Sequence, residues 1–139
     1  MLAVMFVAFI CELPAAQESG GEPADLQDIT LRAEAARKDG RSQDAEALYR
    51  RGLENNPRWA DGWWLLGLLL YDQSRYPEAE TAIKNFMGLQ SGSGPAYALL
   101  GACTYHAGKF EESLDDLQLA QTLGLGDDKT LSRAVRYYT

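Results

Sequence analysis

The chain has 139 residues, of which 46% are apolar and 24% charged, and these proportions are those of one soluble globular domain with a packed core. It has 13 Lys and Arg residues and 20 Asp and Glu residues, which gives a formal net charge of -7. This charge argues against polyanionic partners, so we expect the chain to bind neither nucleic acid nor an anionic membrane surface.

The first ten residues, MLAVMFVAFI, are wholly apolar. The run is too short to span a bilayer as a helix, which takes ~20 residues, but it suits the apolar centre of a secretory signal peptide. We therefore interpret residues 1–16 as a segment like a signal peptide, with cleavage near Ala16, and residues 17–24 (QESGGEPA) as a flexible linker. This predicts an exported bacterial protein, periplasmic or extracellular. The alternative is a cytoplasmic protein in which the apolar run packs on the domain as a helix.

From residue 25 onward the sequence repeats itself with a period of 34 residues. Within each period, two stretches with helical spacing of apolar residues are separated by a short turn, such as DQSRYPE at residues 72–78. A period of this length predicts a solenoid, here an all-α stack of antiparallel helix pairs. The small residues that coincide in this register are Ala33, Gly67 and Gly101; Gly40, Ser74 and Gly108; and Ala45, Ala79 and Ser113.

The repeated glycines predict where helices approach closely. Two antiparallel helices can come together only where one of them presents almost no side chain, and a glycine inside a helix is unfavourable by roughly 1 kcal/mol relative to alanine. We therefore expect Gly67 and Gly101 to face the second helix of their own pair, opposite Ala79 and Ser113.

The residues of the middle and third periods resemble the signature of the tetratricopeptide repeat, W-x2-L-G-x2-Y followed by A-x3-F and P. The matching residues are Trp63, Leu66, Gly67 and Leu70; Ala79 and Ile83; Tyr97, Leu100 and Gly101; and Ser113 and Leu117. The resemblance, to a repeat protein of bacterial type, implies a right-handed superhelical α-solenoid over residues 25–139. It would have units near residues 26–59, 60–93 and 94–127 and a capping helix over residues 128–139. The sequence departs from the signature at Arg32, Ser91 and Leu125.

The predicted capping helix is amphipathic. An apolar stripe of Leu131, Ala134, Val135 and Tyr138 lies apart from its cations, as suits the terminal helix of a repeat stack. Truncation of a longer array, or self-association through this end, is the alternative.

The stretch WWLLGLLLY, residues 63–71, is apolar on two helical faces. Trp63, Leu66 and Leu70 would face the second helix of the pair, whereas a second stripe would be turned away from it. A helix with two apolar faces either is buried on both or binds something. In proteins of this resemblance the first helices line a concave groove. In register, the second stripe consists of Thr30, Glu34 and Arg37; Trp64, Leu68 and Tyr71; Ala98, Ala102 and Tyr105; and Ser132, Arg136 and Thr139.

This stripe leads to a functional hypothesis: a non-catalytic interaction module whose groove takes a peptide or partner protein with a large apolar side chain between Trp64 and Tyr105. The alternative is that Trp64 and Leu68 only pack against neighbouring first helices. The clamp for C-terminal carboxylates known in this family uses Lys and Asn side chains. Here the matching places hold Thr30, Glu34 and Leu68, so we do not expect binding of that kind. The predicted partner-binding residues are Trp64, Leu68, Tyr71, Ala98, Ala102, Tyr105 and Arg136.

Two other functional classes stay open beside this hypothesis. One is a structural component of the cell envelope that self-associates as a homo-oligomer, and the other is an accessory part of a larger multidomain protein. We expect no enzymatic activity, no metal and no cofactor, because the sequence has no phosphate-binding loop and no nucleophile or zinc motif. His106 is the only histidine and Cys103 suits a small buried side chain. The acidic pairs at residues 111–112 and 115–116 suit a solvated helix face.

Overall fold

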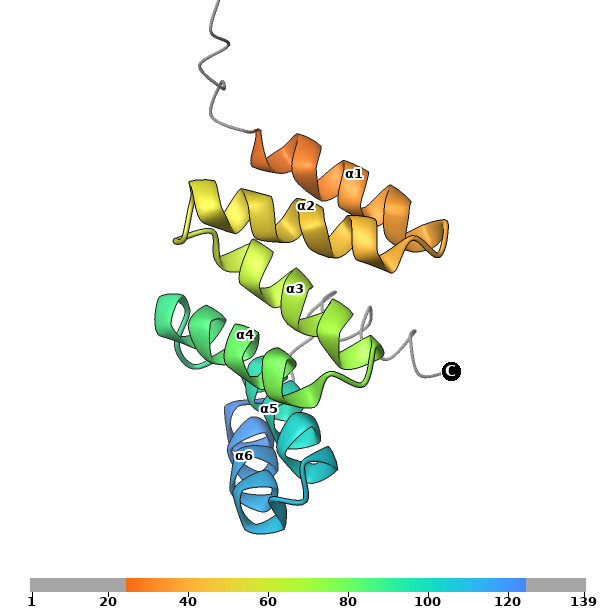
Figure 1. Cartoon of the computed structure of the whole chain (residues 1–139). Coiled ribbons are helices and arrows are strands. Elements are labelled where there is room, and N and C mark those ends of the chain that lie inside the picture. The colour runs from red at the N-terminus through yellow and green to blue at the C-terminus, as the bar shows by residue number, and fades with distance from the viewer. Residues whose placement is uncertain (1–24, 125–139) are drawn as a thin grey trace, which may run out of the picture.

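The computed structural model describes residues 25–124, which form helices and no strands. The predicted all-α solenoid of antiparallel helix pairs is confirmed over this range (Figure 1). The predictions for residues 1–16, 17–24 and 128–139, including Arg136, lie outside the described residues. The helices are α1 (Leu26–Lys38), α2 (Ser42–Asn55), α3 (Ala60–Asp72), α4 (Tyr76–Leu89), α5 (Gly94–His106) and α6 (Phe110–Leu123).

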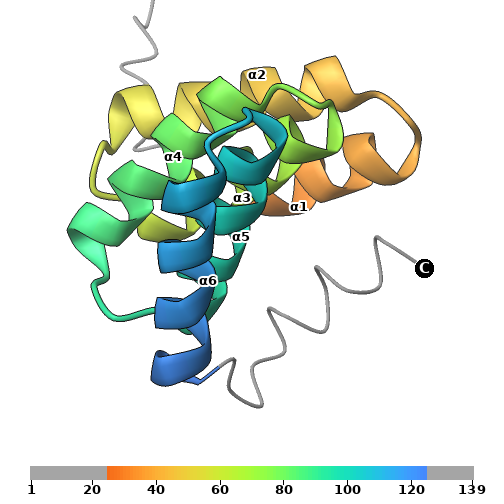
Figure 2. The ribbon, with the colours of Figure 1, turned by 90° about the horizontal axis from the view of Figure 1, so that it is seen from below.

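Equivalent helices begin 34 residues apart along the chain, at Leu26, Ala60 and Gly94 for the first helix of each pair. Each pair packs on the next, and the α5–α6 pair runs steeply across the direction of the α1–α2 pair (Figure 2). The stack therefore turns as it grows, and the first helices α1, α3 and α5 follow one another along one side.

The turn inside each pair has the same backbone geometry. Gly40, Ser74 and Gly108 have φ values of 76°, 60° and 78°, in the left-handed region that glycine adopts readily. Their N–H groups donate to the carbonyl oxygens three residues earlier, at N···O distances of 3.0, 2.8 and 3.0 Å. These bonds satisfy carbonyl groups that the end of a helix leaves open. The same geometry at Gly40 closes the first helix pair, whose match to the repeat signature is the weakest of the three.

The expected close approach of the paired helices is present. A Cβ atom on Gly67 would lie 2.5 Å from Ile83 Cδ1 of α4, and one on Gly101 would lie 2.9 Å from Leu117 Cγ of α6. Ser113 Oγ donates a hydrogen bond of 2.8 Å to the carbonyl oxygen of Gly101. The contact of Gly101 with Ser113 agrees with the sequence, whereas Gly67 meets Ile83 rather than Ala79, one helical turn further along α4.

Trp59 fills the joint between the first two pairs. Trp59 is 8% exposed, and Cβ atoms on Gly52 of α2 and Gly62 of α3 would clash with its ring. Both glycines are thus required by the size of this one side chain.

An ion pair between successive repeats recurs in register. Glu46 of α2 accepts from Arg75 at 2.7 Å, and Glu80 of α4 accepts from Lys109 at 3.4 Å. Both the acidic and the basic positions are 34 residues apart. Burial raises the pKa of Glu46, but the hydrogen bonds from Arg75 and Arg50 outweigh burial and lower it overall. Each cation precedes the second helix of its own repeat and reaches back to the repeat before it.

Candidate functional site

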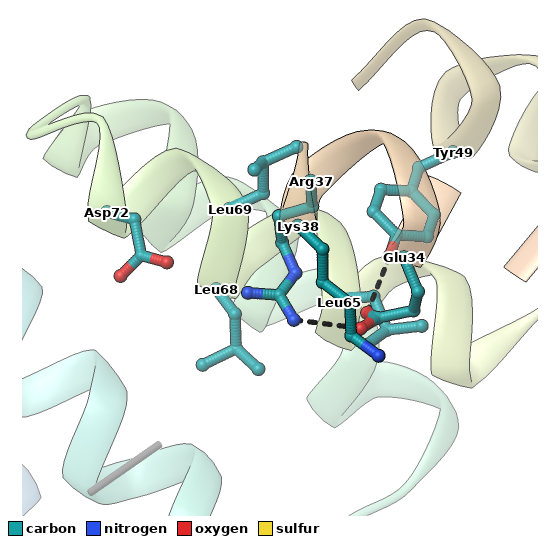
Figure 3. A pocket seen from close by; sticks show the side chains of 8 residues that line it. All are labelled: Glu34, Arg37, Lys38, Tyr49, Leu65, Leu68, Leu69 and Asp72. Atoms are coloured by element: carbon teal, nitrogen blue, oxygen red, sulfur yellow. Dashed lines mark hydrogen bonds and ion pairs between the residues drawn. The ribbon is translucent and has the colours of Figure 1, made fainter. Parts of the chain in front are cut away.

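A hollow of about 170 Å³ opens between α1 and α3 (Figure 3). Its apolar wall consists of Leu65, Leu68 and Leu69, which α3 presents along one side. Tyr49 of α2 reaches in from behind, and its position follows from the buried stripe of α2. The polar rim is formed by Glu34, Arg37 and Lys38 of α1 and by Asp72 at the end of α3.

Glu34 organises the side of the hollow that α1 provides. Its carboxylate accepts from Arg37 at 2.8 Å and from the Tyr49 hydroxyl at 3.1 Å. Burial of the Tyr49 ring, together with the adjacent Glu34 charge, raises the pKa of the phenol well above its ordinary value of 10.0. Tyr49 therefore stays a hydrogen-bond donor at any physiological pH and fixes the Glu34 carboxylate in place.

Asp72 lies across the hollow from these groups (Figure 3). Burial raises the pKa of its carboxyl group, and the positive charge of Arg37 opposes that rise. The hollow thus combines an apolar wall with both signs of charge on its rim. Such an arrangement suits a segment that carries a large apolar side chain and polar groups beside it.

A second feature, which we call the aromatic strip, consists of Tyr71, Tyr76, Tyr105, His106 and Phe110. The rings of Tyr76 and His106 stack with centroids 4.3 Å apart, and Tyr71 lies 5.3 Å from Tyr76 and 5.8 Å from His106. Tyr105 continues the strip at 5.7 Å from His106 and 5.5 Å from Phe110. Tyr105 is 58% and Phe110 63% exposed, so the outer end of the strip is open to solvent.

The structure brings some of the predicted residues together. Leu68 lines the hollow, and Tyr71 follows it at i+3 on the same face of α3. Tyr71 and Tyr105 both contact His106, which joins the ends of α3 and α5. Ala98 and Ala102 are half-buried on α5.

Trp64 is placed differently from the expectation that its stripe turns away from the partner helix. Its ring is only 7% exposed and lies 5.2 Å from the ring of Phe86 on α4. The physical reason is the size of the indole, which together with Ile83 and Leu100 fills the space between α3, α4 and α5. Trp64 therefore packs beneath the surface of α3, whereas the side chains of Leu68 and Tyr71 reach that surface.

Sequence reasoning missed several residues of the site. Lys38, Asp72 and His106 occupy one register position, directly after Arg37, Tyr71 and Tyr105 of the predicted stripe. Extending the stripe by one residue would have found them. Tyr76 and Phe110 are likewise equivalent to each other, at the start of α4 and α6, and only the turn geometry brings Tyr76 to His106 and Phe110 to Tyr105.

The described residues hold no group of three or more His, Cys, Asp or Glu side chains arranged to bind a metal ion. Burial raises the pKa of the Cys103 thiol to about 12, with a smaller contribution from the Glu80 charge. Because a nucleophilic cysteine needs a lowered pKa and access, Cys103 in this state acts as a packed apolar side chain. Over the same range, no helix has both the length and the apolar composition that crossing a membrane requires.

Comparison with known proteins addresses the fold. Residues 30–85 match a family model described as "Tetratricopeptide repeat". No curated protein matches the chain. Among solved structures, "Second TPR of Spaghetti (RPAP3) bound to HSP90 peptide SRMEEVD" is similar with a TM-score of 0.68 and 20% identity, covering 73% of this chain and 94% of that one.

Two further structures are similar over a smaller share of their own length. "Crystal structure of MamA" has a TM-score of 0.69 and 19% identity, over 73% of this chain and 60% of that one. "CopN-Scc3 complex" has a TM-score of 0.67 and 20% identity, over 71% of this chain and 58% of that one. The chain thus spans about three fifths of these two proteins. Together the likenesses show an all-α helical repeat fold of the tetratricopeptide type, and with the family match they support a tetratricopeptide repeat protein.

Proposed function

We propose that this chain is a tetratricopeptide repeat protein that acts as a non-catalytic scaffold, binding a peptide segment of a partner protein across α1, α3 and α5. The proposal rests on one observation above all. Leu68 lines the hollow, and Tyr71, where the aromatic strip begins, lies one helical turn further along the same face of α3, so the apolar recess and the strip are adjacent. The similarity to repeat structures solved with a peptide or a partner protein supports this proposal.

The dimensions of the hollow indicate what the segment carries. Its volume of about 170 Å³ slightly exceeds that of an engineered cavity of about 150 Å³ that takes up benzene. One large apolar side chain of the partner therefore fits against Leu65, Leu68 and Leu69. In this proposal the anchor lies nearer to α1 than the sequence suggested, because Trp64 is buried.

The strip would then take the continuation of the bound segment. Open tyrosine and phenylalanine rings supply apolar area at low cost in side-chain entropy, which makes such residues common anchors in binding surfaces. The net charge of -7 favours a partner segment that carries Lys or Arg, because opposite charges speed association.

A selection from a random peptide library displayed on phage tests the proposal. We expect enriched peptides to share one large apolar residue, and Leu68→Asp to reduce their affinity by at least about tenfold, since it places a charge on the apolar wall. Leu31→Asp is the matched control, because Leu31 is a 66% exposed leucine of α1 that does not line the hollow. Failure to enrich any peptide, or equal affinity for both variants, would rule out this surface.

Export of the chain is a separate proposal, which rests on the apolar run at residues 1–10 and the small residues near Ala16. It is tested by expressing the full chain in a bacterium and sequencing the N-terminus of the product from the periplasm. We expect a new N-terminus close to residue 17. Recovery of the intact chain from the cytoplasm alone would contradict export.

A further inference from the structure

Asp72, the last residue of α3, lines the hollow without a hydrogen bond or an ion pair to any other side chain of residues 25–124. The other acid of the hollow is engaged, because Glu34 accepts from Arg37 at 2.8 Å and from Tyr49 at 3.1 Å. The Asp72 carboxylate is exposed to solvent and thus within reach of a bound molecule. Its oxygens remain available as acceptors.

The two cations of the rim do not neutralise this carboxylate. The Arg37 guanidinium is turned toward Glu34, and the Lys38 ammonium lies farther from Asp72 still (Figure 3). Burial is the larger influence on Asp72 and raises the pKa of its carboxyl group, while the Arg37 charge acts against it without a hydrogen bond. The carboxylate has therefore lost part of its hydration and has gained no direct partner in exchange.

The position of Asp72 relates it to the apolar wall of the hollow. It follows Leu68 by four residues, so the two side chains are neighbours on one side of α3. With a rise of 1.5 Å per residue, they stand about 6 Å apart along the helix axis. A side chain seated against Leu68 thus has a negative charge one helical turn away.

This separation matches the spacing of side chains in an extended peptide. Alternate side chains of such a peptide point in the same direction, and a rise of about 3.3 Å per residue puts them about 7 Å apart. If one apolar side chain enters the hollow, the side chain two positions away in the peptide faces Asp72. Either direction of the peptide meets this condition, so that position either precedes or follows the apolar one.

We propose that the hollow selects segments in which Lys or Arg stands two positions from the large apolar anchor, and that Asp72 sets this preference. The inference rests on the proposed function, because it takes the anchor to bind against Leu65, Leu68 and Leu69. The cation of the partner donates to the Asp72 carboxylate, which makes a charge-assisted hydrogen bond. Asp or Glu at the same position of the partner is rejected, because two carboxylates would meet there.

Selection from the random peptide library on phage tests the preference with three forms of the full chain. The original chain should enrich peptides with an apolar residue and, two positions away, Lys or Arg. Asp72→Lys should enrich the same apolar residue with Asp or Glu at that spacing. Lysine suits the last turn of a helix, so this variant should fold, which its melting temperature checks. Glu54→Lys, at an exposed residue of α2 that does not line the hollow, makes the same change in net charge and should keep the preference for Lys or Arg.

The outcomes separate this inference from the proposed function. Enriched peptides that share the apolar residue but have no basic residue at that spacing would overturn the role of Asp72 and leave the proposed function standing. A basic preference that survives Asp72→Lys, or that Glu54→Lys also reverses, would do the same. If the original chain enriched no peptide at all, both proposals would fall.

Affinity measurements on one selected peptide test the contact itself. The peptide and a version with alanine at the basic position are titrated with the original chain and with Asp72→Asn. We expect Asp72→Asn to weaken the first peptide by about fivefold, which corresponds to ~1 kcal/mol and is the upper end for an exposed ion pair. The alanine version should bind both chains equally. An equal loss for the two peptides, or no loss for either, would show that Asp72 does not contact the basic residue.

Discussion

At the scale of single residues, the position of a glycine decides what an added methyl group does. Gly67 sits against Ile83, whereas Gly88, also in a helix, has no atom within 4 Å of where its Cβ would lie. The same substitution should therefore have opposite effects at the two sites.

Gly67→Ala should destabilise the protein by ~1–3 kcal/mol, because α3 and α4 must move apart or Ile83 must leave its rotamer. Gly88→Ala should instead stabilise it by up to ~1 kcal/mol through helix propensity. Urea unfolding of both variants measures the difference. Equal effects would mean that α3 and α4 do not approach as closely as the coordinates show.

The Cys103 thiol provides a second residue-scale prediction. Since it is fully buried and its pKa is raised to about 12, we expect it to react with a maleimide at pH 8 only as fast as the protein opens. The measurement uses a Cys11→Ser chain, with Leu31→Cys as an exposed control. Rapid labelling of Cys103 in the folded protein would show that α5 is more accessible than its packing indicates.

Single side chains were also where sequence reasoning was weakest. The predicted direction of Trp64 was wrong. Helical spacing gives the angle at which a side chain leaves α3, but it does not give the distance to the neighbouring helices. The indole ring packs in the wider space beside Phe86. The pairing of Gly101 with Ser113 was predictable, since small residues at a fixed offset leave few other arrangements. The stacking of His106 on Tyr76 joins two repeats and has no signature within either one.

At the scale of elements, the recurring ion pairs hold successive repeats in register. Glu46 is the better buried carboxylate of the first joint, with a side chain 14% exposed beside Arg75 at 36%. Its pKa is lowered below 4.5 in the folded protein, where Arg75 and Arg50 overcome the effect of burial. A lowered folded-state pKa gives stability that is fully present above the unfolded value and is lost as the pH falls through the folded value.

Glu46→Gln should consequently cost about 0.5–1 kcal/mol at pH 7, the upper part of the range for pairs near the surface. The difference from the original chain should shrink when the pH is taken well below 4.5, because Glu46 is then protonated. Urea unfolding at both pH values measures it. Asp44→Asn, which removes an exposed partner of Arg41, is the control expected to change little. A cost for Glu46→Gln that is the same at both pH values would exclude the ion pair as its source.

The helices themselves were largely predictable from sequence. The 34-residue spacing of small residues predicted the pairing of the helices, and Gly40 and Gly108, which coincide in that register, have the positive φ values of the turns. Trp59 was not foreseen as a core residue, because it precedes α3 and belongs to neither helical stripe. Its role follows from Gly52 and Gly62, which are glycines only because this ring lies between them.

At the scale of the whole molecule, similarity of fold does not imply that the same ligand is bound. The structure described as the second TPR of Spaghetti holds the HSP90 peptide SRMEEVD, an acidic segment, whereas this chain has a net charge of -7 and presents Glu34 at its hollow. We expect no binding of SRMEEVD in fluorescence anisotropy at micromolar protein, with a scrambled peptide as control. Specific micromolar affinity would show that Arg37 and Lys38 suffice to hold a terminal carboxylate.

The joints between repeats have a mechanical consequence. Each helix contacts chiefly its neighbours along the chain, and equivalent joints are made in the same way. A force applied to the two ends would act on every joint, and the total extension would be the sum of a slight rotation at each. The molecule would lengthen reversibly before any single helix unravelled, and its curvature would change as it did so.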